Sequence, residues 1–295
     1  MKIVTACGIA LETEIHGSAQ GEPLLLIMGL GMQLLGWHED FVQQLVERGF
    51  RVIRFDNRDI GLSQPFDHVG VPNVGLASLR HAFGLPVRSH YALSDMADDA
   101  AHLLDALGIA SAHVCGASMG GMIAQHLAVR HPARVRSLTL MMTTSGARRL
   151  PGPTATVRRA LLRQPPRDAD VPRVVAHAMD FYALIESPAH RSPPGWMAAR
   201  YELSVRRSHR PQGGARQLMA VVADGDRSSL LGDISVPTRI VHGAADPLVP
   251  CAGGLDLSRK IRHASIDVIE GMGHDLPMAL WPRFVANIAA VAALA

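Results

Sequence analysis

The sequence predicts an α/β fold, and three observations support this prediction. From the start to about residue 145, short apolar runs of strand-like composition alternate with helix-period segments, as expected of a parallel sheet covered by helices on both faces. The strand pattern resumes at 237–242 and 265–269, and a helical segment follows. In between, over about 145–225, prolines and arginines accumulate and no strand-like run occurs. We therefore expect a mostly parallel central sheet flanked by helices, with a helical insertion.

Five strands are expected before the insertion, because five runs are short, mostly apolar and ended by Gly, Asp or a polar cluster. They are Leu11–His16, Leu24–Met28, Arg51–Phe55, Ala112–Gly116 and Ser137–Met142. We interpret all five as buried, parallel strands. The expected core therefore comprises residues 1–144 and 226–295, and the insertion comprises residues 145–225.

The clearest helical pattern begins near Ser94, whose hydroxyl is a suitable N-terminal cap. Met96, Ala100, Leu103, Leu104 and Leu107 then fall on one apolar face. Gly108 stands where a helix C-terminus favours a left-handed residue, so we expect the helix to end there. A last helix is expected from about 282 to 293.

Composition and targeting signals limit the class of protein further. The chain has 295 residues, 48% hydrophobic and 19% charged, which is typical of a compact globular protein. Cys7, Cys115 and Cys251 are too few and too far apart for a disulfide framework, which favours a reducing compartment. No signal-peptide pattern and no apolar run of about 20 residues is present. We expect a cytoplasmic protein without membrane insertion.

The charge distribution argues against a nucleic-acid partner. The 29 Lys and Arg outnumber the 26 Asp and Glu by only three, and the basic residues are scattered without interleaved aromatics. Oligomeric state stays open between a monomer and a homodimer.

The strongest local motif is Gly-x-Ser-x-Gly around Ser118, with Gly116 and Gly120 at the flanking positions. It joins a predicted strand to a predicted helix, which is the context in which a serine in a tight turn exposes its hydroxyl. The helix that follows directs its first backbone N–H groups toward an oxyanion formed beside this serine. Ser118 is therefore the predicted nucleophile, and Met119 N–H is the first predicted oxyanion donor.

A serine hydroxyl needs a base, and the base needs an orienting carboxylate. Asp246 follows the predicted strand 237–242 in a loop at the carboxyl edge of the sheet, where open α/β sheets place their sites. His274 lies in a glycine-flanked loop after the last predicted strand and reaches the same edge. We predict Asp246 as the orienting acid and His274 as the base. The competing acids Asp224, Asp226 and Asp233 precede the strand, and Asp275 is sterically unsuited as the neighbour of the base.

These motifs, in the chain order Ser…Asp…His, resemble those of the α/β-hydrolase superfamily. The segment 56–63 is also similar to the family's Asp-x-Arg-Gly-x-Gly-x-Ser pattern, with Asp59 where Gly is usual; this departure is expected to affect a loop and not the chemistry. Met-Gly at 28–29 and Leu-Gly-Trp at 35–37 resemble a subgroup of bacterial carboxylesterases that includes aclacinomycin methylesterase.

The resemblance implies several further roles. Leu30 N–H would be the second oxyanion donor, and residues 145–225 would form a helical cap over the site. Met32, Trp37, Met122 and Trp196 would bind an apolar part of the substrate, unless such residues only pack the interior. Between Arg148 and Arg216, 13 arginines face 5 acids, so the cap is basic; it either steers acidic substrates or is a solvated arginine surface.

The expected reaction is hydrolysis of a small-molecule carboxylic ester through an acyl-enzyme on Ser118, with no metal or other cofactor. The same residues are compatible with a lactone, a polyketide methyl ester, a carbon–carbon bond or perhydrolysis as the substrate or reaction. A hydrolase-fold protein that binds a ligand without turnover is the alternative from another functional class.

Overall fold

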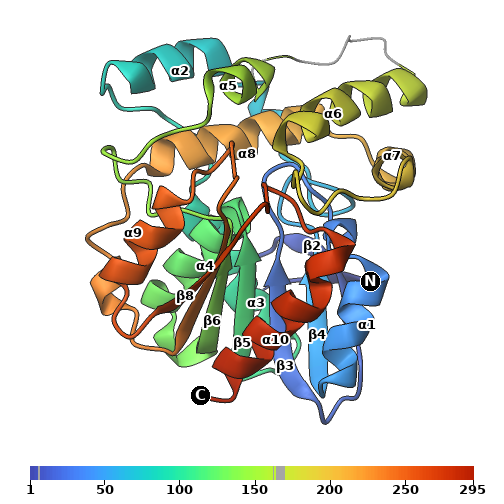
Figure 1. Ribbon diagram of the computed structural model, residues 1–295, viewed down its shortest axis with the longest axis vertical. Helices are drawn as coiled ribbons and strands as arrows, with labels where there is room; N and C mark the ends of the chain where they lie inside the picture. Colours follow the sequence, from blue (N-terminus) through green and yellow to red (C-terminus); the bar gives the residue numbers. More distant parts are fainter. Residues whose placement is uncertain (6, 162, 164–169) are drawn as a thin grey trace.

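The computed structural model describes residues 1–5, 7–161, 163 and 170–295, and it contains a central sheet with helices on both faces (Figure 1). The strands are β1 (Lys2–Val4), β2 (Ala10–His16), β3 (Glu22–Ile27), β4 (Phe50–Phe55), β5 (Ala112–Ala117), β6 (Val135–Met141), β7 (Thr238–Gly243) and β8 (Ser265–Ile269). The helices are α1 (Glu39–Glu47), α2 (Val74–Ala82), α3 (Leu93–Ala106), α4 (Met119–Arg130), α5 (Ala155–Leu161), α6 (Val171–Ile185), α7 (Trp196–Arg207), α8 (Pro211–Asp224), α9 (Ala252–Lys260) and α10 (Trp281–Ala292).

The sheet order is β1-β2-β4-β3-β5-β6-β7-β8, and the strands from β4 to β8 pair in parallel. The predicted α/β class and mostly parallel sheet are confirmed. The interpretation of Leu11–His16 as a parallel strand was wrong, because β2 pairs antiparallel with both β1 and β4. Strand β1 was not predicted from the sequence.

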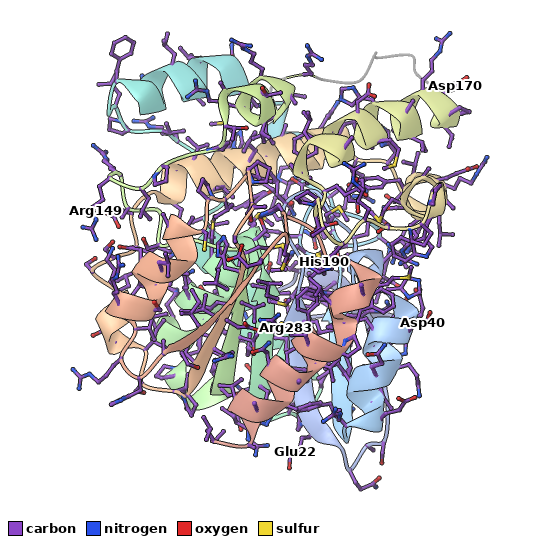
Figure 2. All side chains as sticks on the ribbon, viewed as in Figure 1. Glu22, Asp40, Arg149, Asp170, His190 and Arg283 are labelled. Atoms are coloured by element: carbon purple, nitrogen blue, oxygen red, sulfur yellow. The ribbon has the colours of Figure 1, made fainter. Side chains whose placement is uncertain are left out.

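Alternation along the buried strands divides the interior into two cores. On β3, Leu25 and Ile27 face a core that contains residues of α3, α4 and α9, whereas Leu24 and Leu26 face residues of α1 and α10. This follows from the two-residue period of a strand, which sends successive side chains to opposite faces. The side chains drawn in Figure 2 fill the space between the sheet and these helices.

Helix α3 has the predicted buried face and ends at Ala106, with Leu107 as the C-cap and Gly108 following in a left-handed conformation with φ 66°. Its start differs from the prediction. The helix begins at Leu93, and the Asp95 carboxylate accepts a hydrogen bond from Ala92 N–H at 2.8 Å. Ser94 is therefore not the N-cap, because the carboxylate of Asp95 takes the exposed backbone donor instead.

Helices α5 to α8 lie between β6 and β7 in the chain, and together we call them the α5–α8 segment. In Figure 1 this segment lies beyond the upper end of the sheet, with α8 running across the ends of the strands. Helix α2 lies at the same end and packs on α8. None of the described helices is both long and apolar enough to span a membrane.

Candidate active site

Ser118 occupies the turn between β5 and α4, and its backbone has a φ of 55°. A non-glycine residue adopts this left-handed conformation only when the surrounding structure imposes it. Two glycines allow the tight turn. A Cβ on Gly116 would lie 2.3 Å from the carbonyl oxygen of Gly120, and a Cβ on Gly120 would lie 2.0 Å from that of Ile27. Any larger residue at either position would push α4 away from the sheet.

The structure brings together the three polar side chains predicted to act as one unit. His274 Nε2 lies 3.0 Å from Ser118 Oγ, and His274 Nδ1 lies 2.7 Å from Asp246 Oδ2. Both contacts are within hydrogen-bond range, and they come from residues 156 and 28 positions apart in the chain. The chain of contacts runs from hydroxyl to imidazole to carboxylate.

Asp246 is held in a fixed orientation by its own loop. Its Oδ1 accepts hydrogen bonds from the backbone N–H groups of Leu248 and Val249 at 2.9 and 2.8 Å, which leaves Oδ2 for His274. The His274 backbone N–H donates in turn to the carbonyl of Ile185 at the end of α6. The acid and the imidazole are therefore both positioned by backbone contacts.

A second buried histidine, His242, lies beside the acid and was not identified from the sequence. Its Nε2 donates to the Val249 carbonyl at 2.7 Å and lies 3.6 Å from Asp246 Oδ2. Burial lowers the pKa of His242, so the ring stays neutral. A neutral ring leaves Asp246 as the charged partner of His274 alone.

Two backbone amides lie close to the serine along the chain or in space. Gly29 is so close that a Cβ on it would lie 3.2 Å from the Ser118 Cβ, so the following residue, Leu30, begins next to the hydroxyl. The N–H groups of Leu30 and Met119 have no hydrogen-bond acceptor within the described residues. Unpaired N–H groups beside a serine hydroxyl can donate hydrogen bonds to an oxyanion that forms there.

Gln217 on α8 fixes the loop that carries Leu30. Its Oε1 accepts the Gly31 N–H at 2.9 Å, and its Nε2 donates to the Arg58 carbonyl at 2.9 Å. The side chain is fully buried, so both ends of the amide are used. No motif marks this glutamine in the sequence, because its partners lie about 160 to 190 residues away.

Asp56 connects the loop after β3, at Leu34, to Arg207 of α7. This buried carboxylate accepts hydrogen bonds from Leu34 N–H at 2.7 Å, Leu62 N–H at 2.9 Å and Arg207 at 2.7 Å. Burial raises the pKa of Asp56, although these hydrogen bonds and the charge of Arg207 act against the rise. Arg207 also donates to Gln33 at 2.6 Å, so the α5–α8 segment and the loop after β3 share one polar network.

Asp59, the departure from the family pattern, lies in a left-handed conformation with φ 73° and forms a buried ion pair with Arg216 of α8. The two guanidinium contacts measure 2.5 and 2.8 Å, and the Tyr91 hydroxyl adds a third hydrogen bond at 3.1 Å. Burial would raise the pKa of Asp59, but the hydrogen bonds and charge of Arg216 outweigh it, and the pKa lies below its usual range. This residue links the core to α8.

Asp275, next to the imidazole, is turned away from it. Its carboxylate accepts hydrogen bonds from the Tyr182 hydroxyl at 2.9 Å and from the N–H and hydroxyl of Ser187. Asp224, another acid considered from the sequence, hydrogen-bonds His126 at 2.7 Å and pairs with Arg227. Neither acid contacts His274 through its side chain.

The four apolar residues predicted to bind substrate have different surroundings. Trp37 is fully buried and stacks on Phe41 with ring centroids 5.7 Å apart. Met122, on α4, is 8% exposed and belongs to the hydrophobic core. Met32 receives a contact from the Tyr201 hydroxyl at 3.8 Å. Their part in substrate binding stays a prediction.

Trp196 at the start of α7 packs against the core. Its ring lies 5.2 Å from that of His38 and 6.2 Å from that of Trp281, which begins α10. Arg200 places its guanidinium 5.4 Å from the Trp196 ring centroid. This aromatic contact joins the α5–α8 segment to the core.

Comparison with known proteins gives one consistent family. Residues 22–278 match the model of the alpha/beta hydrolase fold. Rhodomycin D methylesterase from Streptomyces sp. (strain C5) is 28% identical, covering 98% of this chain and 97% of that protein. The 2-hydroxymuconate semialdehyde hydrolase of Pseudomonas sp. (strain CF600) is also 28% identical, covering 97% and 91%. An esterase from Exiguobacterium antarcticum superposes with a TM-score of 0.75 at 21% identity, covering 99% of both chains. With its sheet order, its serine turn and a family match over most of its length, the chain belongs to the alpha/beta hydrolase family.

Proposed function

We propose that this hydrolase cleaves carboxylic esters through an acyl-enzyme on Ser118. The observation that carries the proposal is the continuous contact from Ser118 through His274 to Asp246, at 3.0 and 2.7 Å. The nearby N–H groups of Leu30 and Met119 have no acceptor among the described residues. A nucleophile, a base, an orienting acid and two donors are the parts that acyl transfer requires.

In the proposed reaction, Ser118 Oγ attacks the ester carbonyl while His274 Nε2 takes the hydroxyl proton. The negative oxygen of the tetrahedral intermediate accepts hydrogen bonds from Leu30 and Met119 N–H, and Asp246 stabilises the imidazolium. His274 then gives the proton to the departing alcohol. Water repeats the attack on the acyl-enzyme, with His274 again as base, and the carboxylic acid leaves.

We further propose that residues 145–225 act as a cap over this site. Two contacts support this role: the His274 N–H donates to the Ile185 carbonyl of α6, and Gln217 of α8 holds the loop that carries Leu30. Methyl esters are the favoured substrates, because relatives over nearly the full length are rhodomycin D methylesterases.

A carbon–carbon bond is the second candidate substrate, favoured by the 2-hydroxymuconate semialdehyde hydrolase that matches 97% of this chain. A panel separates the two: p-nitrophenyl esters of increasing chain length, rhodomycin D, and 2-hydroxymuconate semialdehyde. Ester turnover with no cleavage of the semialdehyde supports the first proposal, and cleavage of the semialdehyde without ester turnover supports the second.

The chemistry is tested with a fluorophosphonate probe and the Ser118→Ala variant. The unaltered protein should react with the probe and hydrolyse esters, and Ser118→Ala should lose both activities. Ser94→Ala, on α3, is the matched control and should keep both. Ester hydrolysis that persists in Ser118→Ala, or probe labelling without any burst of product, would overturn the proposal; the latter result would instead indicate a ligand-binding protein.

A further inference from the structure

Helix α2 and its flanking residues carry an unusual group of exposed apolar side chains. Five such residues fall between positions 71 and 85 and are between 50% and 74% exposed: Val71, Leu76, Leu79, Phe83 and Leu85. Leu76, Leu79 and Phe83 are spaced i, i+3 and i+7, so they share one face of the helical turns, and Phe83 N–H continues the helical bonding to the Leu79 carbonyl. Single exposed apolar residues are ordinary, but such a group indicates an interaction surface.

The inner side of α2 is already packed. Ala77, 5% exposed, faces inward where α2 packs on α8. Within the part of the chain that the structure describes, the outer apolar face is exposed, and Figure 1 shows α2 at the extreme end of the molecule, with α5 at the same end. Side chains from α2 project outward at the top of Figure 2. We call the outer face of residues 71–85 the α2 surface.

The two chain segments at this end of the molecule are basic. Residues 68–94 and 145–163 contain no Asp or Glu, but they contain seven arginines: Arg80, Arg88, Arg148, Arg149, Arg158, Arg159 and Arg163. Arg149 pairs with Asp256. Arg80, Arg88, Arg148, Arg158 and Arg159 are exposed, and none of these five forms an ion pair with a described residue. Arginines that lack a carboxylate partner among the described residues, beside exposed apolar side chains, favour a partner that is both anionic and apolar.

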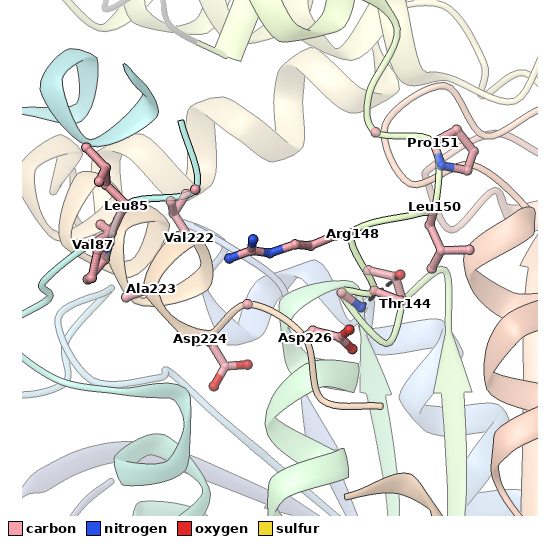
Figure 3. A pocket seen from close by; sticks show the side chains of 16 residues that line it. Leu85, Val87, Thr144, Arg148, Leu150, Pro151, Val222, Ala223, Asp224 and Asp226 are labelled. Carbon is pink, nitrogen blue, oxygen red and sulfur yellow. Dashed lines mark hydrogen bonds between the residues drawn. The ribbon is translucent and has the colours of Figure 1, made fainter. Parts of the chain in front are cut away.

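A cavity of about 500 Å³ adjoins the surface at the end of α2. Leu85, Val87 and Val222 line one side, and Arg148 extends toward them from the opposite loop (Figure 3). A Cβ on Gly84 would lie 3.5 Å from an Arg148 guanidinium nitrogen, so this charge lies directly beside the apolar end of α2. Asp224 and Asp226 line another part of this cavity, and Asp224 is paired with Arg227. The apolar and cationic groups therefore meet at the rim beside α2.

A second copy of this chain fits the surface poorly. A twofold contact would place the acid-free face against itself, and facing arginines repel each other. An anionic bilayer meets both requirements, because acyl chains accept the apolar side chains while lipid phosphates pair with the arginines.

We propose that the α2 surface docks on the surface of anionic lipid bilayers, with Leu76, Leu79 and Phe83 entering the interface. The contact is peripheral, as for an amphipathic helix lying in the plane of the headgroups. It is independent of the chemistry at Ser118, so either proposal can fail without the other.

The test is co-sedimentation of the full chain with vesicles of phosphatidylcholine alone or with 30% phosphatidylglycerol. Binding is expected only to the anionic vesicles, and it should weaken from 50 to 500 mM salt. Phe83→Ser should lower the partition coefficient at least about tenfold, and Arg80→Gln about fivefold. Leu203→Ser and Arg206→Gln, exposed positions on α7, are the matched controls and should bind as the unaltered chain does.

Melting temperature and hydrolysis of a water-soluble ester check that each variant is folded. Absence of binding to anionic vesicles at low salt overturns the proposal, as does an equal loss in the α7 controls. Light scattering provides a further check: a dimer that Leu79→Ser dissociates would show that a second copy occupies this surface, and the proposal would then be wrong.

Discussion

At the scale of single residues, Asp246 shows how a side chain is oriented by its neighbours. Two backbone N–H groups occupy its Oδ1, so only Oδ2 faces the imidazole of His274. This arrangement fixes the proton of His274 on Nδ1 and leaves Nε2 as the acceptor facing Ser118.

The Asp246→Asn variant tests this orientation. An amide in place of the carboxylate presents an N–H donor to His274 and favours the wrong tautomer, so kcat for ester hydrolysis should fall by about 10⁴-fold. KM should change little, because substrate contacts are retained. Stopped-assay kinetics and circular dichroism check the prediction; a folded variant that keeps a tenth of the activity would contradict it.

Asp59 gives a pH-dependent prediction about stability. Its pKa is lowered in the folded protein, so the ion pair with Arg216 stabilises the fold above the ordinary aspartate value of about 3.9 and loses this contribution as pH falls through the lowered pKa. Asp59→Asn tolerates the left-handed backbone but removes the buried ion-pair partner of Arg216, which keeps only the exposed Asp67 carboxylate and the Gly70 carbonyl. The free energy of unfolding at pH 7 should fall by about 3 kcal/mol.

Urea unfolding at pH 7 and at pH 3 to 5 measures this difference. The variant should lose less stability than the unaltered chain as pH falls, because the titrating group is absent. Asp226→Asn, an exposed acid, is the control. Equal pH dependence in Asp59→Asn and the unaltered chain would contradict the assigned role.

Sequence reasoning located Ser118, Asp246 and His274 because each lies in a short motif at a strand end, where local geometry determines position. It missed Gln217 and His242 because their importance depends on partners that only the folded chain brings close. For Asp59, the motif comparison identified the departure from the pattern, but not the arginine 157 positions away that explains it.

At the scale of elements, strands β3 to β7 were predictable because most of their residues are buried and their runs are mostly apolar, whereas the edge strand β8 is only partly buried. Strand β2 alternates the buried residues Leu11 and Thr13 with the partly exposed Glu12 and Glu14, and this alternation favours an antiparallel strand with one exposed face. Helix α2 was missed because its outer face is apolar and its length is only nine residues. Periodicity therefore identified the buried elements better than the outer ones.

Helix α8 is expected to influence the reaction through Gln217. In Gln217→Met, Gly31 N–H loses its acceptor and the loop that carries Leu30 is freed to shift. The kcat for ester hydrolysis should fall by about 10- to 100-fold, less than the loss of an entire oxyanion donor. KM should stay within a factor of about three, because the residue touches no substrate.

Gln212→Met, an exposed position on the same helix, is the matched control. Inhibition by a boronic acid that mimics the tetrahedral intermediate provides a second measurement. Its affinity should weaken in parallel with kcat for Gln217→Met. Lower kcat with unchanged boronate affinity would show that Gln217 does not position the oxyanion donors.

At the scale of the whole molecule, polar networks join the α5–α8 segment to the core at separate points. Arg207 reaches Asp56, Arg216 reaches Asp59, and Tyr182 reaches Asp275. The Asp56 and Asp59 carboxylates are fully buried, so separating the segment from the core would expose charges that each lose a close partner. We therefore expect one cooperative unfolding transition for the core and this segment.

Arg207→Met tests this coupling. Amide hydrogen exchange should increase in α7 and in the loop around Gln33, while β5 and β6 stay protected. Arg206→Met, the next residue on α7 and exposed to solvent, is the control and should leave the exchange pattern unchanged. Uniform loss of protection across the sheet would contradict a local coupling.

The chain contains three tryptophans, and their positions give the molecule a natural optical signal. Trp196 belongs to α7, whereas Trp281 and the buried Trp37 belong to the core, and the Trp196 and Trp281 rings lie 6.2 Å apart. Withdrawal of α7 would move Trp196 into water and shift its emission to longer wavelength, while the Trp37 indole stays shielded. Intrinsic fluorescence in a stopped-flow instrument can therefore follow displacement of α7 in real time on the unlabelled protein.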